Sequence, residues 1–166
     1  MLPLKRALRV VCLSDTHLRR RGGLPGWCLD RLARANLILH AGDLVALSVL
    51  EELAQLAPLE AVSGNMDALA LKGTLPRRRI TEIGGVSIGL VHDPGPAQGR
   101  ALRLAGYFPN CDAIVYGHTH VPEIERLERC LVVNPGSPTT PRSTLGATLV
   151  ELTIVEGKIE PAIITP

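Results

Sequence analysis

Short apolar segments that favour β-strands alternate with segments of helical periodicity in the first part of the chain. Residues 8–13 (LRVVCL), 36–40 (NLILH) and 59–63 (LEAVS) are typical of buried strands, whereas residues 27–35 and 46–56 place Leu and Ala at helical spacing. Two successive strand–helix–strand units predict a parallel sheet with right-handed crossovers.

The pattern changes after about residue 77. Residues 77–93 predict a β-hairpin around Gly84-Gly85, and a helix at 97–106 and a strand at 112–116 follow. The remaining apolar stretches indicate successive strands without a helix, over residues 123–129, 130–134, 147–157 and 158–166. A parallel first half and a largely antiparallel second half predict two sheets packed face to face with helices outside, in one domain over residues 1–166.

Composition excludes several classes of partner. Aromatic residues make up 2% of the 166 residues and the formal net charge is +2, so neither a base-stacking platform nor a general polyanion binder is expected. This also weighs against a nuclease that acts on long nucleic acid. No apolar run approaches the roughly 18 residues that span a bilayer, so no membrane association is expected.

The N-terminal residues lack the pattern of a signal peptide, and a cytoplasmic location is therefore expected. The four cysteines form no C-x-x-C pair, which predicts buried free thiols in a reducing compartment: Cys12, Cys28, Cys111 and Cys130. The edges of a strand-rich second half need covering, so a homo-oligomer is a further expectation.

Residues with metal-binding side chains follow five of the predicted strands. They are Asp15 and His17, Asp43, Asn65, His92, and His118 and His120. Open α/β sheets place their sites beyond the carboxyl ends of strands, so these clusters are expected to converge. Residues i and i+2 of an extended segment project to the same side, so each Asp-x-His or His-x-His segment would offer two donors together. Glycines before Asp43, Asn65 and His118 permit sharp turns or close approach there.

This ligand set favours two metal ions. Imidazole suits zinc, iron and nickel, whereas carboxylate and carbonyl oxygens suit manganese and magnesium. Seven ligands are too many for one open catalytic ion, but they suit two ions about 3.5–4 Å apart that clamp a phosphoryl group for in-line attack. Mn²⁺ fits the mixed set, with Ni²⁺, Fe²⁺ or Zn²⁺ as alternatives.

Together, these motifs resemble the calcineurin-like metallophosphoesterases. The match runs through Asp15-x-His17, Gly42-Asp43, Gly64-Asn65, His92 and Gly117-His118-x-His120, in family order over residues 10–142. The segments Gly64–Asp67 and Asn134–Ser137 are similar to those of the small bacterial and archaeal phosphodiesterase branch. The resemblance implies an α/β fold, a four-layer αββα sandwich of two mixed sheets flanked by helices.

The resemblance also implies a role for each ligand. Asp15, His17 and His120 would bind a first metal ion, Asp43 would bridge both ions, and the second would be completed by Asn65, His92 and His118. The implied activity is metal-dependent hydrolysis of a small phosphodiester by a hydroxide that the dinuclear centre activates. Asp43 and Asn65 are then the candidate catalytic residues, and Asn65 also contacts substrate. One departure lies at the substrate edge, where Asp93-Pro94 follows His92 in place of the family's Gly-His pattern.

A different class of function stays open. A eukaryotic retromer subunit resembles the same branch and serves mainly as a scaffold for protein binding. Scaffold relatives can lose ligands, whereas this chain has the complete set, which favours the enzyme because unpaired buried charges are costly.

The other polar residues allow structural explanations. His40 is expected to be a core residue that at most orients a ligand, and Asp67 and Asp93 are either turn residues or supports for ligands. The arginine runs at 19–21 and 77–79 are expected to be solvated. Arg142, after the Asn134–Ser137 segment, is a candidate for a bidentate contact with the substrate phosphate.

Overall fold

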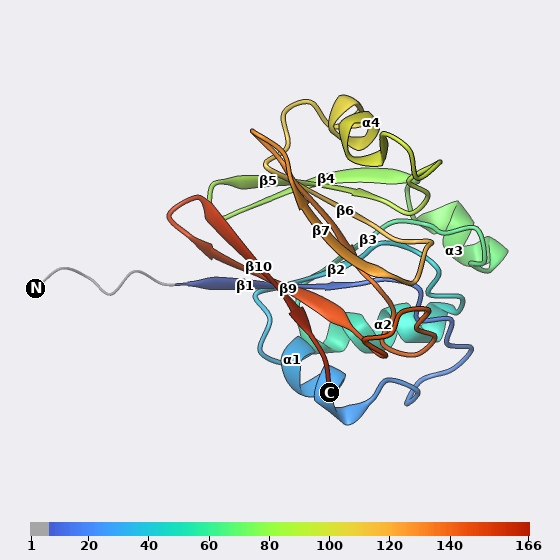
Figure 1. The fold of residues 1–166 in the computed structure, drawn as a ribbon. Helices are drawn as coiled ribbons and strands as arrows, with labels where there is room; N and C mark the ends of the chain where they lie inside the picture. The colour runs from blue at the N-terminus through green and yellow to red at the C-terminus, as the bar shows by residue number, and fades with distance from the viewer. Residues whose placement is uncertain (1–6) are drawn as a thin grey trace, which may run out of the picture.

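The computed structural model describes residues 7–166, which contain two five-stranded mixed sheets (Figure 1). The first sheet has the order β10-β9-β1-β2-β3 and the second the order β4-β5-β6-β8-β7. The strands are β1 (Leu8–Leu13), β2 (Leu37–His40), β3 (Leu59–Ala61), β4 (Arg78–Ile83), β5 (Val86–Val91), β6 (Ala113–Tyr116), β7 (Pro122–Arg126), β8 (Leu131–Pro135), β9 (Leu149–Val155) and β10 (Lys158–Ile164). The helices are α1 (Gly26–Leu32), α2 (Leu47–Leu56), α3 (Leu69–Thr74) and α4 (Arg100–Tyr107).

Strand pairing confirms the parallel first half and corrects part of the second. β1, β2 and β3 are parallel neighbours, and β4 and β5 form the predicted hairpin. However, β5, β6 and β8 are also parallel to one another, so the second half is less antiparallel than predicted. β5 and β6 are parallel because α4 lies between them along the chain and supplies a crossover. β6 and β8 are parallel because β7, which lies between them along the chain, occupies the edge of the sheet and pairs antiparallel with β8. The last two strands return to the first sheet, where β9 pairs antiparallel with β1.

Alternating side chains of the strands build separate apolar layers. Val10 and Cys12 of β1 point into the core between the sheets, whereas Val11 and Leu13 point to the outer face of the first sheet. Helices α1, α2 and α3 pack on that outer face, and α4 packs on the outer face of the second sheet (Figure 1). The predicted four-layer αββα sandwich is therefore confirmed.

Several element boundaries differ from the sequence prediction. The six-residue helix α3 was not expected, because its sequence LALKGT contains Gly and Thr and buries only Leu71. Helix α1 ends at Leu32, earlier than predicted, because residues 33–36 turn into β2 and Asn36 accepts the Arg9 N–H through its side chain. All four cysteines are buried free thiols, as predicted. One domain over residues 1–166 stays a prediction, and across residues 7–166 no helix is long and apolar enough to cross a membrane.

Truncating a side chain between the sheets should destabilise the fold strongly. Ile88 of β5 is fully buried, so Ile88→Ala should lower the free energy of unfolding by about 2–5 kcal/mol through lost burial and a cavity. Ile80 on the neighbouring strand β4 is 58% exposed, and Ile80→Ala should change it by no more than about 0.5 kcal/mol. Urea denaturation measures both values, and equal effects would contradict the layer assignment.

Candidate metal centre

The loops that carry the ligands leave the extended conformation immediately after their strands. Asp15, His17, Asp43, His118 and His120 all have positive φ, between 47° and 74°. Asp and His adopt this left-handed region more readily than most residues, yet each such residue costs about 1–3 kcal/mol. The expectation of an extended geometry for the paired ligands was therefore wrong. His118 and His120 consequently point to different partners rather than acting together.

Two glycines permit the close approach that the sequence suggested. A Cβ atom at Gly64 would overlap Asp43 Oδ1, and one at Gly117 would overlap Ser14 Oγ. Backbone bonds hold the first two ligand loops together beyond the sheet, because the Asp15 N–H donates to Gly42 O and the His17 N–H donates to Asp43 O, each at 3.0 Å. The glycines thus allow ligand loops from different strands to pack against one another.

Asp67 joins two further segments of the centre. Its buried carboxylate accepts the Val45 N–H through Oδ1 and the Gly64 N–H through Oδ2, both at 2.7 Å. These two donors lie beside Asp43 and Asn65 in the chain. Asp67 therefore supports the loops of Asp43 and Asn65. Among the described residues, the exposed Asp93 accepts a hydrogen bond only from the Gly95 N–H and belongs to a turn.

The Asn134–Ser137 segment also supports the centre, a role that its motif did not reveal. Ser137 Oγ donates to the carbonyl oxygen of Asp15 at 2.7 Å, and Asn134 Nδ2 donates to that of Gly117 at 3.0 Å. Just beyond the segment, Thr140 O accepts the Nδ1 proton of His120 at 2.7 Å. Sequence reasoning missed Thr140, because nothing in a Thr-Thr pair indicates a contact 20 residues away.

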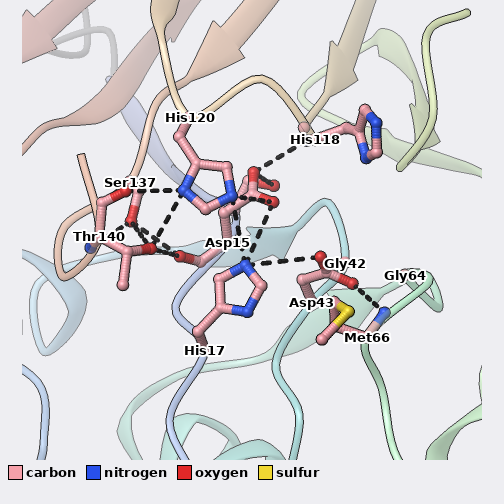
Figure 2. A network of polar contacts seen from close by, with 12 residues as sticks. Asp15, His17, Gly42, Asp43, Gly64, Met66, His118, His120, Ser137 and Thr140 are labelled. Carbon is pink, nitrogen blue, oxygen red and sulfur yellow. Dashed lines mark hydrogen bonds and ion pairs between the residues drawn. The ribbon is translucent and has the colours of Figure 1, made fainter. Parts of the chain in front are cut away.

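One half of the centre combines His17, His120 and Asp15 (Figure 2). The two Nε2 atoms of the histidines lie 3.3 Å apart. Asp15 Oδ1 lies 3.4 Å from Nε2 of His120 and 3.9 Å from Nε2 of His17. Three ligand atoms therefore face a common point.

The other half combines His92, Asn65 and His118, with Asp43 between the two halves. His92 Nε2 lies 3.0 Å from Asn65 Oδ1, and His118 Nδ1 lies 3.3 Å from the same oxygen. Asp43 Oδ2 is 3.4 Å from His92 Nε2 and 3.5 Å from His17 Nε2. The structure thus brings all seven residues selected from the sequence into one cluster.

The hydrogen bonds of the cluster fit a cation. Carbonyl oxygens accept from Nδ1 of His92 (Ala41 O, 2.8 Å) and from Nδ1 of His120, so each ring carries a proton at Nδ1 and turns its Nε2 inward. Within residues 7–166, Asp15 Oδ1 is buried without a hydrogen-bond partner. Nε2 atoms that carry no proton would converge with this oxygen as acceptors, and a divalent ion would offset their repulsion.

Electrostatics favour the neutral form of His17 and the ionised form of Asp43, but they favour the protonated form of His92. Burial lowers the pKa of His17 and so favours its neutral form. Burial opposes ionisation of Asp43, but contact with His92 and the Met66 N–H outweighs it and lowers the pKa of the carboxyl group. Burial also works against protonation of His92, but the Asp43 carboxylate reverses this effect and raises the pKa of His92. An ion between these two groups would compete with that proton.

His40 lies behind the cluster and joins two of its loops. Its Nδ1 accepts the Gly42 N–H at 3.2 Å, so its Nε2 carries the proton and donates to Thr16 Oγ1, also at 3.2 Å. The ring is fully buried, and burial lowers its pKa from 6.5 to about 3. His40 is therefore a neutral core residue that supports the loops.

Arg142 lies at the edge of this region. It is exposed, and its backbone N–H donates to His120 O at 3.1 Å. Within residues 7–166, its guanidinium has no hydrogen-bond or ion-pair partner, so its contact with substrate stays a prediction. Arg21, in contrast, pairs with Glu51 at 2.9 Å and belongs to a solvated face, as predicted.

Sequence comparison shows the family. A model of the calcineurin-like phosphoesterase superfamily domain matches residues 8–157. The chain belongs to this superfamily. A probable metallophosphoesterase of Methanothermobacter thermautotrophicus is 43% identical over 80% of this chain and 78% of its own length. Another, of Methanocaldococcus jannaschii, is 40% identical over 92% of this chain and 78% of its own length. The residues around the cluster are thus those of a phosphoesterase of the metal-dependent type.

Solved structures share the fold of this phosphoesterase. Vacuolar protein sorting 29 of Cryptosporidium parvum has a TM-score of 0.77 at 22% identity, over 95% of this chain and 97% of that one. A structure described as a novel archaeal phosphodiesterase has a TM-score of 0.72 at 24% identity, over 95% of this chain and 100% of that one. The likeness therefore extends over nearly the whole sandwich.

The neutral state of His40 predicts a loss of stability in acid. Its pKa is about 3 in the folded chain and 6.5 in the unfolded chain, so between these values only the unfolded state gains the proton. The free energy of unfolding should therefore fall as the pH is lowered from about 6.5 towards 3. His40→Gln should flatten this dependence, measured by urea denaturation in EDTA. In the unchanged protein, NMR should find a neutral His40 ring at pH 5, and a charged ring would contradict the assignment.

Ligand substitutions should affect metal binding in two different ways. Asp43→Asn should weaken both sites and His92→Ala only one, by at least about 10–100-fold, the loss typical of groups that merely support a ligand. Calorimetric titration with Mn²⁺ measures each site. Asp93→Asn is the matched control, because this neighbouring carboxylate bonds only to Gly95 N, and two intact sites are expected. If His92→Ala still bound Mn²⁺ at two sites with unchanged affinity, His92 would not be a metal ligand.

Proposed function

We propose that this phosphoesterase hydrolyses phosphodiesters with a centre for two divalent metal ions. The observation that carries the proposal is the position of Asp43, whose Oδ2 lies 3.5 Å from His17 Nε2 and 3.4 Å from His92 Nε2. A carboxylate between two groups of ligands is suited to bridge two ions. A single catalytic ion with an open coordination position is held by about three protein ligands, so it would leave about half of the seven residues without a role.

The residues divide between the two ions as follows. Asp15, His17 and His120 would hold one ion, and Asn65, His92 and His118 the other, with Asp43 bound to both. When bound, the ions supply positive charge that lowers the pKa of a water molecule and offsets the charge of the phosphoryl oxygens. Mn²⁺ best fits this mixture of imidazole, carboxylate and amide oxygen, with Ni²⁺, Fe²⁺ and Zn²⁺ as alternatives.

Asn65 gives the centre a side that faces substrate. Its Oδ1 faces the rings of His92 and His118, so its Nδ2 keeps both N–H donors. The residue is exposed, unlike Asp15, Asp43 and His92. Its amide can therefore orient the phosphate of a bound diester by donating a hydrogen bond to a phosphoryl oxygen.

A scaffold for protein binding is the alternative function. It has support from the likeness to vacuolar protein sorting 29, although at 22% identity this likeness concerns the fold. The complete ligand set favours the enzyme. Without a cation, Asp15 Oδ1 would stay buried and without a hydrogen bond, which is costly.

Elemental analysis together with a substrate screen tests the proposal. Purified protein should contain two divalent ions per chain, and with Mn²⁺ it should hydrolyse bis(4-nitrophenyl) phosphate faster than 4-nitrophenyl phosphate. EDTA should abolish both reactions. Two bound ions without turnover of any ester would favour the scaffold, and preference for the monoester would overturn the diester assignment. A cytoplasmic location and a homo-oligomer that covers the sheet edges are parts of the same proposal.

Met66 predicts how the reaction depends on the leaving group. Many larger members of the superfamily have a histidine after the metal-binding asparagine, where it can protonate the leaving oxygen. Methionine has no such proton, and general acid catalysis contributes about 10²–10⁴-fold. The other histidines are ligands or, like His40, buried. Rates for aryl phosphodiesters should therefore fall steeply as the leaving-group pKa rises.

Turnover of a series of substituted phenyl diesters, under conditions in which chemistry limits the rate, measures this dependence. Met66→His should make the dependence shallower. A shallow dependence in the unchanged protein would mean that another group supplies the proton.

A further inference from the structure

A cavity of about 590 Å³ opens directly beside the proposed second metal site. Asn65 and His92 line the side next to the cluster. The other lining residues include Lys72 of α3, Arg77 just before β4, Arg78 at the start of β4 and Tyr107 at the end of α4. The cavity thus joins segments from both sheets and continues outward from the ligands. A substrate held at the metal centre would extend into it.

The cavity has a strong excess of positive charge. Lys72, Arg77 and Arg78 line it, and Asp93 is the one carboxylate among its lining residues. Across the described chain, no carboxylate lies within ion-pair distance of any of these three cations, whereas the next residue, Arg79, pairs with Glu60. The three arginines at 77–79, which were expected to be solvated, therefore differ in their surroundings. Two of them face the cavity without acidic partners.

Two of these cations are held in place by contacts that leave their charge unneutralised. Lys72 Nζ donates to Asn65 O at 2.6 Å, which fixes the ammonium group against the ligand loop. The guanidinium carbon of Arg78 lies 4.1 Å from the centroid of the Tyr107 ring. A cation–π contact orients a guanidinium while its N–H donors stay available. The cavity is thus prepared for an anion.

We propose that this cavity binds a second anionic group, phosphate or carboxylate, on the same substrate whose scissile phosphate occupies the metal centre. Guanidinium groups pair with either anion through two parallel hydrogen bonds. The preferred substrates are then phosphodiesters with one charged arm rather than diesters with two neutral arms. This inference rests on the proposed function for its scissile phosphate, but the anion site itself can be tested without turnover.

Diesters with one common leaving group test the selectivity. The 4-nitrophenyl diesters whose second arm is 2-carbamoylethyl, 2-carboxyethyl or 2-phosphonoethyl share one leaving group, and the first two arms are similar in shape and differ in charge. The unchanged protein should show at least about tenfold higher kcat/KM for a charged arm than for the neutral arm, corresponding to about 1.4 kcal/mol. The better of the two charged arms identifies the anion, and equal kcat/KM for all three esters would overturn the proposal.

Substitutions then locate the effect. Arg77→Gln and Arg78→Gln should each reduce the ratio of kcat/KM between charged and neutral arms about tenfold. Arg79→Gln is the matched control, because it removes the same charge one position away, where Glu60 is the partner, and it should keep the ratio. If Arg79→Gln lowered this ratio as much as Arg77→Gln and Arg78→Gln do, the effect would be general electrostatic attraction by the surface, and the proposed anion site would be wrong.

Binding measurements separate this proposal from the proposed function. Calorimetry with Mn²⁺-loaded protein compares methylphosphonate with bisphosphonates that carry two to five methylene groups between their phosphorus atoms. The best bisphosphonate should bind at least about tenfold more tightly, and Arg77→Gln and Arg78→Gln should remove this gain, whereas Arg79→Gln should not. If the bisphosphonate bound more tightly but no ester were hydrolysed, the proposed esterase function would be wrong and the proposed anion site would stand. Hydrolysis without the gain would overturn the anion site alone.

Discussion

A buried carboxylate oxygen without a hydrogen-bond donor is the constraint on which this structure depends. Within residues 7–166, Asp15 Oδ1 has no hydrogen-bond partner, and Nε2 of His120 and Nε2 of His17 lie 3.4 Å and 3.9 Å from it. A desolvated acceptor that has neither a donor nor a cation beside it is costly. A divalent ion between these atoms would offset that cost, and many of the surrounding contacts hold the cluster in the arrangement that such an ion would need.

The supporting contacts link loops that would otherwise relax. Ligands with positive φ occupy a strained backbone region, and a set of buried polar groups stabilises it. Asp67 joins the loops of Asp43 and Asn65, His40 joins those of Thr16 and Gly42, and Ser137 holds Asp15 through its carbonyl oxygen. The candidate ligands are therefore held in place by residues outside the cluster, and such preorganisation would lower the cost of binding ions.

The cluster and the cavity beside it differ in the sign of their charge. The buried carboxylates of Asp15 and Asp43 attract cations. The adjoining cavity presents three cations that have no acidic partner within residues 7–166: Lys72, Arg77 and Arg78. A phosphoester with a second negative group matches both regions at once. Because a shared sandwich fold does not decide function, the activity of this chain depends on such side chains and not on the architecture.

The sequence by itself predicted most of the strands, the hairpin at Gly84-Gly85 and the seven candidate ligands that the structure brings together, because short apolar runs and metal-binding side chains at strand ends are local signals. It could not reveal α3, whose few residues carry no periodicity, nor the parallel pairing of β5, β6 and β8, which depends on contacts between distant segments. Only the tertiary structure decided which arginines of the 77–79 run have an acidic partner among the described residues. Glu60 of β3 pairs with Arg79, whereas Arg77 and Arg78 face the cavity. The reason is that Glu60 lies far from these arginines in the sequence, so the sequence alone does not show which of them it neutralises.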